Sequence, residues 1–405
     1  MFKKNTPQES RIANSKKLPR LTVFLGAGGV GKTTLSAGYA VALAEQGLKV
    51  GLMSIDPAKR LKSALGVEEL PELGCVIQLA TSNDSHADKK NENKSDKKKD
   101  SDNNKKSEGQ LIAALLLVGD SLKRWVKAEG LSQASEQRLL LNPLFRAITD
   151  KLATATDTFA AVRMAEWVEL HPELDELIID TAPGIHAIDF LSKPEKLISF
   201  LDSKLVEWLK WFVGGQEQKS GLWQKVVKVG ARKVLDGLAQ IGGQGFLINF
   251  GEFLILLDDV FLTMLKRLET ARSWLRNSDT RFVLVSSVRE DTAKVALELG
   301  ESLKALHMKA RVAVINRSFP EDLANDAGLA QILSSQTSGE ATFFVNALKA
   351  NIQTEAYVKN QLGPLSEELV CLPLMADLDG VQNLRLADLG SLGRHLIARS
   401  EKLKA

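Results

Sequence analysis

The 405-residue sequence predicts a doubly wound α/β fold, built on a mostly parallel sheet into which an all-helical subdomain is inserted. Three observations support this prediction. Short aliphatic runs alternate with helical patterns, a glycine-rich loop follows the first run, and two long stretches between the runs have only helical spacing. We therefore expect one sheet domain whose chain is interrupted by helices.

Seven short apolar runs are candidate strands. Each is too short for a helix and lacks strict polar alternation, as expected for strands that are covered on both faces of a parallel sheet. The runs are Leu21–Leu25, Val50–Ile55, Val76–Ala80, Glu176–Ile179, Phe282–Ser286, Val312–Ile315 and Leu369–Leu372. Helical patterns follow several of them, for example at Thr33–Gln46 and Asp291–His307.

Two stretches, Leu111–Val168 and Ile188–Leu275, break this alternation and read as one helix after another. All six tryptophans fall in the same part of the chain: Trp125, Trp167, Trp208, Trp211, Trp223 and Trp274. Aromatic residues can be part of any hydrophobic core. Because the tryptophans of this chain fall only between residues 125 and 274, we expect a second, all-helical subdomain there.

The expected domain order combines these patterns. The sheet core comprises residues 20–81, 175–194 and 278–405, and the helical subdomain comprises residues 109–174 and 195–277. Between them, residues 82–108 consist almost entirely of Ser, Asn, Asp, Glu and Lys. Such a segment cannot bury apolar area, and we expect a solvated insert there.

Charge, cysteine and histidine content exclude several classes of function. The balance of 53 Lys+Arg against 50 Asp+Glu gives no basic excess for nucleic-acid binding. Cys75 and Cys371 form no CxxC pair, and the five histidines have no HxxxH or HExxH spacing, so a thiolate or imidazole metal site is not expected. The N-terminus is polar, and the most apolar stretch, Leu238–Leu257, contains Glu252. We expect a cytoplasmic protein without a membrane span.

The glycine-rich loop carries the clearest chemistry. It reads Gly26-Ala27-Gly28-Gly29-Val30-Gly31-Lys32-Thr33-Thr34, which matches the pattern G-x-x-x-x-G-K-[ST] at the start of a helix. Glycines let backbone N–H groups surround a phosphate, a solvent-facing Lys32 neutralises the β and γ oxygens, and the Thr33 hydroxyl binds Mg²⁺. The predicted fold is therefore that of a P-loop NTPase.

Two aspartates follow strands whose carboxyl ends should meet at the same edge of the sheet. They lie in Ser54-Ile55-Asp56-Pro57-Ala58 and in Ile179-Asp180-Thr181-Ala182-Pro183-Gly184. Asp180 is placed to hold the hydrated Mg²⁺, and Asp56 to orient or deprotonate the attacking water. The alternative is that each aspartate simply ends a strand in a turn. At another strand end, Asn316 has the paired amide donor and acceptor that an adenine edge needs, or else it is a turn residue.

Taken in order, the motifs resemble the ArsA/Get3 family of ATPases. The resemblance covers nearly all of residues 20–400 and rests on G-A-G-G-V-G-K-T-T, S-I-D-P-A, D-T-A-P-G-I-H, F-V-L-V-S-S-V-R-E, V-I-N-R and L-P-L-M-A-D-L-D-G-V. It implies an ATPase with Mg²⁺ as cofactor that works as a homodimer. It also implies that Asp56 is the switch I catalytic aspartate, which acts with Lys32, and that Asp180 is the switch II aspartate.

The resemblance implies further contacts. Adenine would be bound by Asn316 and Arg317, together with the loop at Pro373 and Leu374. The helical region would bind a protein or membrane client or report the nucleotide state to it, which places the protein in the cytoplasm or at the cytoplasmic face of the inner membrane.

The sequence also departs from the family. Its loop has Ala27 where the family usually has a lysine that reaches the opposite subunit's nucleotide. Lys59 or Arg60 could supply that charge, or they form an ordinary solvated pair. The chain has one P-loop and two cysteines, too few for the arsenite site of one branch of the family, and it lacks the zinc CxxC of another.

Three functions follow as alternatives. The first is an ATPase that couples hydrolysis to conformational change in a dimer acting on a protein or membrane client. The second is the ATPase subunit of an arsenite or oxyanion efflux system. The third is a spatial organiser of the ParA/MinD type, which the large helical insertion and a C-terminus without Phe or Trp disfavour.

Overall fold

The computed structural model describes most of the sheet domain. The described residues are 18–55, 60–79, 109–116, 124–125, 127, 137, 141–142, 156–184, 187, 191, 258–320, 328, 331, 334, 340–375 and 384–404. The charged insert at 82–108, most of the segment 195–277 and three tryptophans, Trp208, Trp211 and Trp223, lie outside them. The inserted helical subdomain therefore stays a prediction.

Within the described residues, eight strands form one sheet in the order β3-β4-β2-β5-β1-β6-β7-β8. The strands are β1 (Arg20–Gly26), β2 (Lys49–Ser54), β3 (Cys75–Ile77), β4 (Gln110–Leu115), β5 (Glu176–Asp180), β6 (Arg281–Ser287), β7 (Ala310–Ser318) and β8 (Ser366–Pro373). All neighbours pair in parallel except β3 and β4, which are antiparallel at one edge. The predicted mostly parallel sheet is confirmed.

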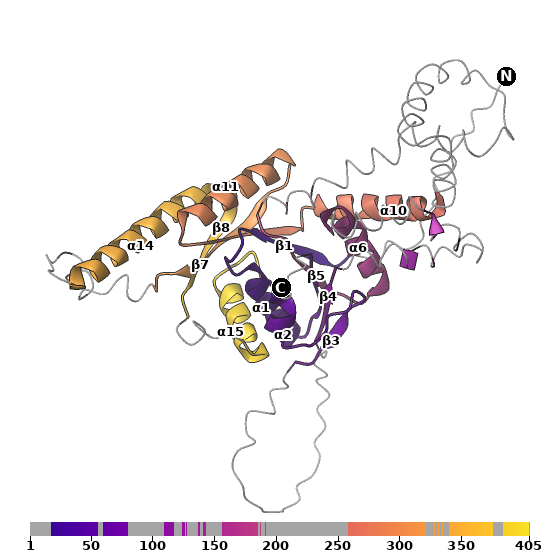
Figure 1. Cartoon of the computed structure of the whole chain (residues 1–405), viewed down its shortest axis with the longest axis horizontal. Helices are drawn as coiled ribbons and strands as arrows, with labels where there is room; N and C mark the ends of the chain where they lie inside the picture. The colour runs from indigo at the N-terminus through magenta and orange to yellow at the C-terminus, as the bar shows by residue number, and fades with distance from the viewer. Residues whose placement is uncertain are drawn as a thin grey trace, which may run out of the picture.

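Helices cover both faces of this sheet (Figure 1), which makes the fold doubly wound. One face packs against α6 (Thr156–Leu170), α10 (Asp258–Leu275), α11 (Glu290–Ala305) and α14 (Glu340–Leu362). The other packs against α1 (Lys32–Glu45), α2 (Arg60–Leu65) and α15 (Leu386–Ala398). A short 3₁₀ turn, η2 (Gly363–Leu365), links α14 to β8.

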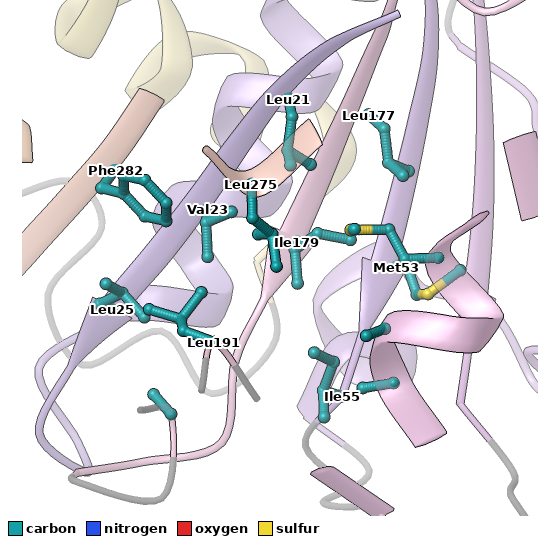
Figure 2. Close-up of a cluster of buried hydrophobic side chains, with 14 of the residues drawn as sticks. Leu21, Val23, Leu25, Met53, Ile55, Leu177, Ile179, Leu191, Leu275 and Phe282 are labelled. Atoms are coloured by element: carbon teal, nitrogen blue, oxygen red, sulfur yellow. The ribbon is translucent and has the colours of Figure 1, made fainter. Parts of the chain in front are cut away.

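Figure 2 shows the core on the first face, where side chains from the adjacent strands β2, β5, β1 and β6 meet. Leu21, Val23 and Leu25 alternate along β1 toward this face, whereas Phe24 points into the core on the other face. Because both faces are buried, the strand reads as a continuous apolar run without polar alternation.

One strand is missing from the sequence prediction. Gln110–Leu115 forms β4 and pairs in parallel with β2, so the assignment of the chain from Leu111 onward to helix is wrong at this point. The run QLIAAL is apolar at nearly every position and rich in good helix formers, so its pattern does not separate a buried strand from a helix. As a consequence, the strand that ends at Asp180 is the fifth along the chain and not the fourth.

The described tryptophans belong to the core of the sheet domain. Trp125, Trp167 and Trp274 are all buried in the cluster on the first face. Trp167 of α6 lies so close to β2 that a Cβ added at Gly51 would be 2.4 Å from its ring, and the Trp274 indole N–H donates to the Pro19 carbonyl at 3.0 Å. These three side chains therefore attach helices to the sheet, contrary to the inference that tryptophan marks a separate unit.

Helices α1 and α15 touch through their backbones, which gives a prediction for stability. A Cβ added at Gly393 would lie 1.9 Å from the Gly38 carbonyl oxygen, which is part of a helix backbone and cannot step aside. Gly393→Ala is expected to lower the free energy of unfolding in urea by about 1–3 kcal/mol. Gly390→Ala is the matched control, because its Cβ would meet only the ends of long side chains, Glu45 at 2.6 Å and Arg394 at 3.2 Å, which can move aside. Equal stability of the two variants would contradict the prediction.

None of the helices in the described part of the chain combines the length and the apolar character needed to cross a membrane.

Candidate nucleotide-binding site

The glycine-rich loop runs from the end of β1 to the start of α1, as its sequence predicts. Two of its glycines are required by close contacts. A Cβ at Gly26 would lie 2.2 Å from the Val285 carbonyl oxygen, and a Cβ at Gly31 would lie 2.4 Å from the Asn316 amide nitrogen. Gly31 also has a φ of +93°, a left-handed conformation that glycine adopts without strain. The loop therefore packs closely against β6 and β7.

Lys32 is the first residue of α1, and its side chain is only 7% exposed. Its ammonium group donates to the carbonyl oxygens of Gly26 at 3.0 Å and of Ala27 at 2.8 Å. The expectation that Lys32 faces solvent is therefore wrong, because the loop turns two carbonyls inward and encloses the charge. The Lys32 ammonium group lies in the loop at the positive end of the α1 dipole. The charge of the ammonium group and the helix dipole both favour the binding of an anion there.

Asp180 ends β5 between β1 and β2, and it is completely buried. Its Oδ2 accepts hydrogen bonds from the hydroxyls of Thr33 at 2.8 Å and Ser54 at 3.1 Å. The structure thus brings Thr33 and Asp180 together, and it adds Ser54, which the sequence reading did not single out. The position of Ser54 at a strand end on the same edge of the sheet was the only signal for it.

A hydroxyl and a carboxylate oxygen at this distance fit Mg²⁺, which prefers oxygen ligands. Magnesium in nucleotide sites is usually held by one or two protein oxygens together with phosphates and water. The described residues contain no group of three His, Cys, Asp or Glu side chains able to hold a metal. A metal at Thr33 and Asp180 would therefore depend on the nucleotide for further ligands.

The segment after Asp180 packs against the glycine-rich loop. The Thr181 hydroxyl donates to the Phe24 carbonyl at 2.7 Å, and the Gly184 N–H donates to the Gly26 carbonyl at 2.9 Å. The segment after Asp180, where the family resemblance implies switch II, is therefore hydrogen-bonded to β1 and to the first residue of the glycine-rich loop.

Asn316 lies near the end of β7 and contacts the glycine-rich loop itself. Its amide nitrogen donates to the Val30 carbonyl at 2.9 Å, and its amide oxygen accepts from the Arg317 N–H at 3.1 Å. Arg317 adopts a left-handed φ of 58°, which turns the chain at the end of the strand. Asn316 thus joins the candidate base-binding residues to the phosphate-binding loop.

A cavity of about 540 Å³ opens beside the glycine-rich loop, within the size range of small-ligand sites. Of the predicted residues, Gly28, Gly29, Arg317 and Leu374 line it, while Pro373 precedes Leu374 at the end of β8. The remaining lining residues were not predicted: Ser287, Val288, Arg289, Thr292, Ser318, Phe319, Pro320, Asn351 and Glu355.

Asp56, the predicted catalytic aspartate, lies outside the described residues, as does Lys59. Arg60 begins α2. Ala27 is nearly buried in the loop, and Thr34 follows Thr33 in the first turn of α1.

The contact between Asn316 and Val30 leads to a prediction. Asn316→Ala is expected to weaken Mg-ATP binding by about 10-fold, because loss of one hydrogen bond releases the Val30 carbonyl from β7. Titration calorimetry measures the effect, and Asn346→Ala, at an exposed position of α14, is the matched control. An unchanged affinity in Asn316→Ala would show that the loop keeps its shape without this contact.

Comparison with known proteins shows that parts of this chain are similar in sequence to ATPases. Residues 19–117 match the family model described as "Anion-transporting ATPase". The chain is 30% identical over 188 residues to the arsenical pump-driving ATPase of Escherichia coli, an alignment that covers 46% of this chain and 28% of that protein. The same figures hold for the arsenical pump-driving ATPase of Acidiphilium multivorum.

A shorter match is closer in sequence. The putative arsenical pump-driving ATPase 2 of Aquifex aeolicus is 53% identical over 49 residues, which are 12% of this chain and 16% of that protein. The chain spans 28% of the length of the first two relatives, and the family model covers the part of the chain that holds β1, the glycine-rich loop and α1.

Proposed function

We propose that this chain is a P-loop ATPase of the ArsA/Get3 family, and that it binds Mg-ATP at the carboxyl ends of β1, β2 and β5 and hydrolyses the β–γ phosphate bond. The observation that carries this proposal is the pair of contacts around the loop. Lys32 is enclosed by loop carbonyls, and the Thr33 hydroxyl lies 2.8 Å from the buried carboxylate of Asp180.

Each residue has a distinct task in this proposal. The backbone of the loop and the N-terminus of α1 bind the phosphates, and Lys32 offsets charge that develops on the γ-phosphate oxygens. Thr33 and Asp180 would hold Mg²⁺, which when bound neutralises the β and γ oxygens. Asp56, which follows β2, would orient or deprotonate the attacking water. Ser54 and Thr33 fix the carboxylate of Asp180 through their hydroxyls.

We further propose that hydrolysis drives conformational change in a homodimer that acts on a protein or membrane client. The Gly184 contact to the end of β1 supports coupling between the phosphate site and the chain that follows β5. Two nucleotide sites that face each other bring phosphates of like charge together, and cations must compensate. Because Ala27 cannot do so, Lys59 and Arg60 are the proposed source of this charge.

Sedimentation tests the dimer directly. With Mg²⁺ and a non-hydrolysable ATP analogue, the parent is expected to dimerise, and a double variant with alanine at positions 59 and 60 is expected to dimerise less. Equal dimer fractions would remove these two side chains from the proposal. A parent that stays monomeric with the analogue would remove the dimer itself.

A second candidate function is suggested by the names of the relatives, which are arsenical pump-driving ATPases. The cysteines of this chain argue against a thiol site for arsenite. Cys75 lies in β3 and Cys371 in β8, at opposite edges of the eight-stranded sheet. Phosphate release with and without arsenite separates the two candidates, since stimulation by arsenite would favour the efflux function.

A further inference from the structure

Helix α14 forms part of the cavity beside the glycine-rich loop, although no motif in it predicts a site. Asn351 and Glu355 lie four residues apart on one face of this helix, and both line the cavity. Phe319, from the chain that follows β7, lines it as well. The nucleotide cavity therefore has a wall from α14.

Glu355 is the buried residue of this wall. Only 6% of it is exposed, whereas Asn351 is exposed. Its Oε2 accepts a hydrogen bond from the Phe319 N–H at 2.6 Å, and its Oε1 lies 2.7 Å from the ammonium group of Lys359. Lys359 is not among the lining residues, so the charge of Glu355 is offset from outside the cavity while the carboxylate stays at the wall.

A carboxylate at this place has a definite chemical consequence. It repels phosphate, so the wall from α14 suits the uncharged part of a nucleotide, while Gly28 and Gly29 of the glycine-rich loop, which also line the cavity, suit the phosphates. A carboxylate accepts about four hydrogen bonds, and the contacts to Phe319 and Lys359 use about two of them. The carboxylate of Glu355 can therefore accept further hydrogen bonds, and a nucleoside offers N–H and O–H donors for them.

We propose that Glu355 is a specificity-determining residue of the nucleotide site, which accepts hydrogen bonds from N–H or O–H donors of the nucleoside. This inference rests on the proposed function. In adenosine the donors are the exocyclic amino group and the two ribose hydroxyls. A site built around such a contact rejects analogues that lack the donor, because a hydrogen bond to a charged acceptor is then lost.

Binding by the unaltered protein gives the first test. Titrations with Mg-ATP, its 2′-deoxy and 3′-deoxy forms, and purine riboside triphosphate remove one donor at a time. At least one of these analogues is expected to bind about 10-fold or more weakly than ATP, and its identity shows which donor Glu355 contacts. If all of them bind within about twofold of ATP, the proposal is wrong.

Two variants then distinguish a direct contact between Glu355 and the nucleoside from a role of Glu355 in positioning the Phe319 loop. Glu355→Gln is expected to reduce the discrimination to less than about threefold, while the affinity for inorganic triphosphate stays unchanged. Lys359→Met, the matched control, removes the ion pair but keeps the carboxylate, so discrimination should persist. If Glu355→Gln weakens all ligands equally, including triphosphate, Glu355 only holds the Phe319 loop. If Lys359→Met abolishes discrimination as fully as Glu355→Gln does, the ion pair is responsible and the carboxylate contact is not.

The same titrations distinguish this inference from the proposed function. Nucleotides that bind and are hydrolysed without discrimination overturn the role of Glu355 alone. An unaltered protein that binds neither nucleotide nor triphosphate overturns both.

Discussion

Replacing Lys32 by alanine is expected to lower ATP hydrolysis by about 100-fold or more. The Lys32 ammonium group is enclosed with two loop carbonyls, where water is largely excluded and a charge acts strongly on the phosphate oxygens. The fold should remain, because Gly31, Val30 and their contacts to β7 still hold the loop. The measurements are phosphate release and thermal unfolding.

Lys304→Ala is the matched control for Lys32→Ala. Lys304 is in the last turn of α11, and its side chain is 77% exposed, so its removal should change neither turnover nor melting temperature. Turnover in Lys32→Ala at the rate of the parent would contradict the assignment of the phosphate site.

Asp180→Asn is expected to give the second large effect, a loss of about 100-fold in Mg-dependent hydrolysis. The amide keeps the shape of the side chain, but it removes the charge that would hold Mg²⁺ beside Thr33. The Mg²⁺ concentration needed for half-maximal activity should rise by about 10-fold, which a titration at fixed ATP measures.

Stability separates this effect from damage to the fold. Asp180 is completely buried, and a neutral amide is less costly to bury than a carboxylate, so the melting temperature of Asp180→Asn should equal or exceed that of the parent. Asp279→Asn, at an exposed turn, is the control for loss of one acidic charge. Full activity at an unchanged Mg²⁺ requirement would show that Asp180 has no part in holding the metal.

The sequence predicts those parts of the candidate site that are contiguous in the chain. The loop from Gly26 to Thr34 could be predicted because its glycines, lysine and threonine act within one turn, and Asp180 because a buried strand leads directly to it. Strand order then brings Thr33 and Asp180 together, since β5 lies beside β1.

Other parts depended on packing and could not be predicted. The burial of Lys32 follows from the directions of the Gly26 and Ala27 carbonyls, which no residue type specifies. Glu355 lies in a long helix with an ordinary pattern, and it reaches the cavity only because α14 packs beside the end of β7. Strand β4 was missed because Leu and Ala suit a helix as well as a buried strand.

Phosphate release from ATP by the purified, unaltered chain tests whether the glycine-rich loop forms a Mg-ATP site. We expect phosphate release that requires Mg²⁺, stops in excess EDTA and is lost in Lys32→Ala at the same protein concentration. Release that persists in EDTA, or that is equal in the parent and Lys32→Ala, would contradict a Mg-ATP site at the glycine-rich loop.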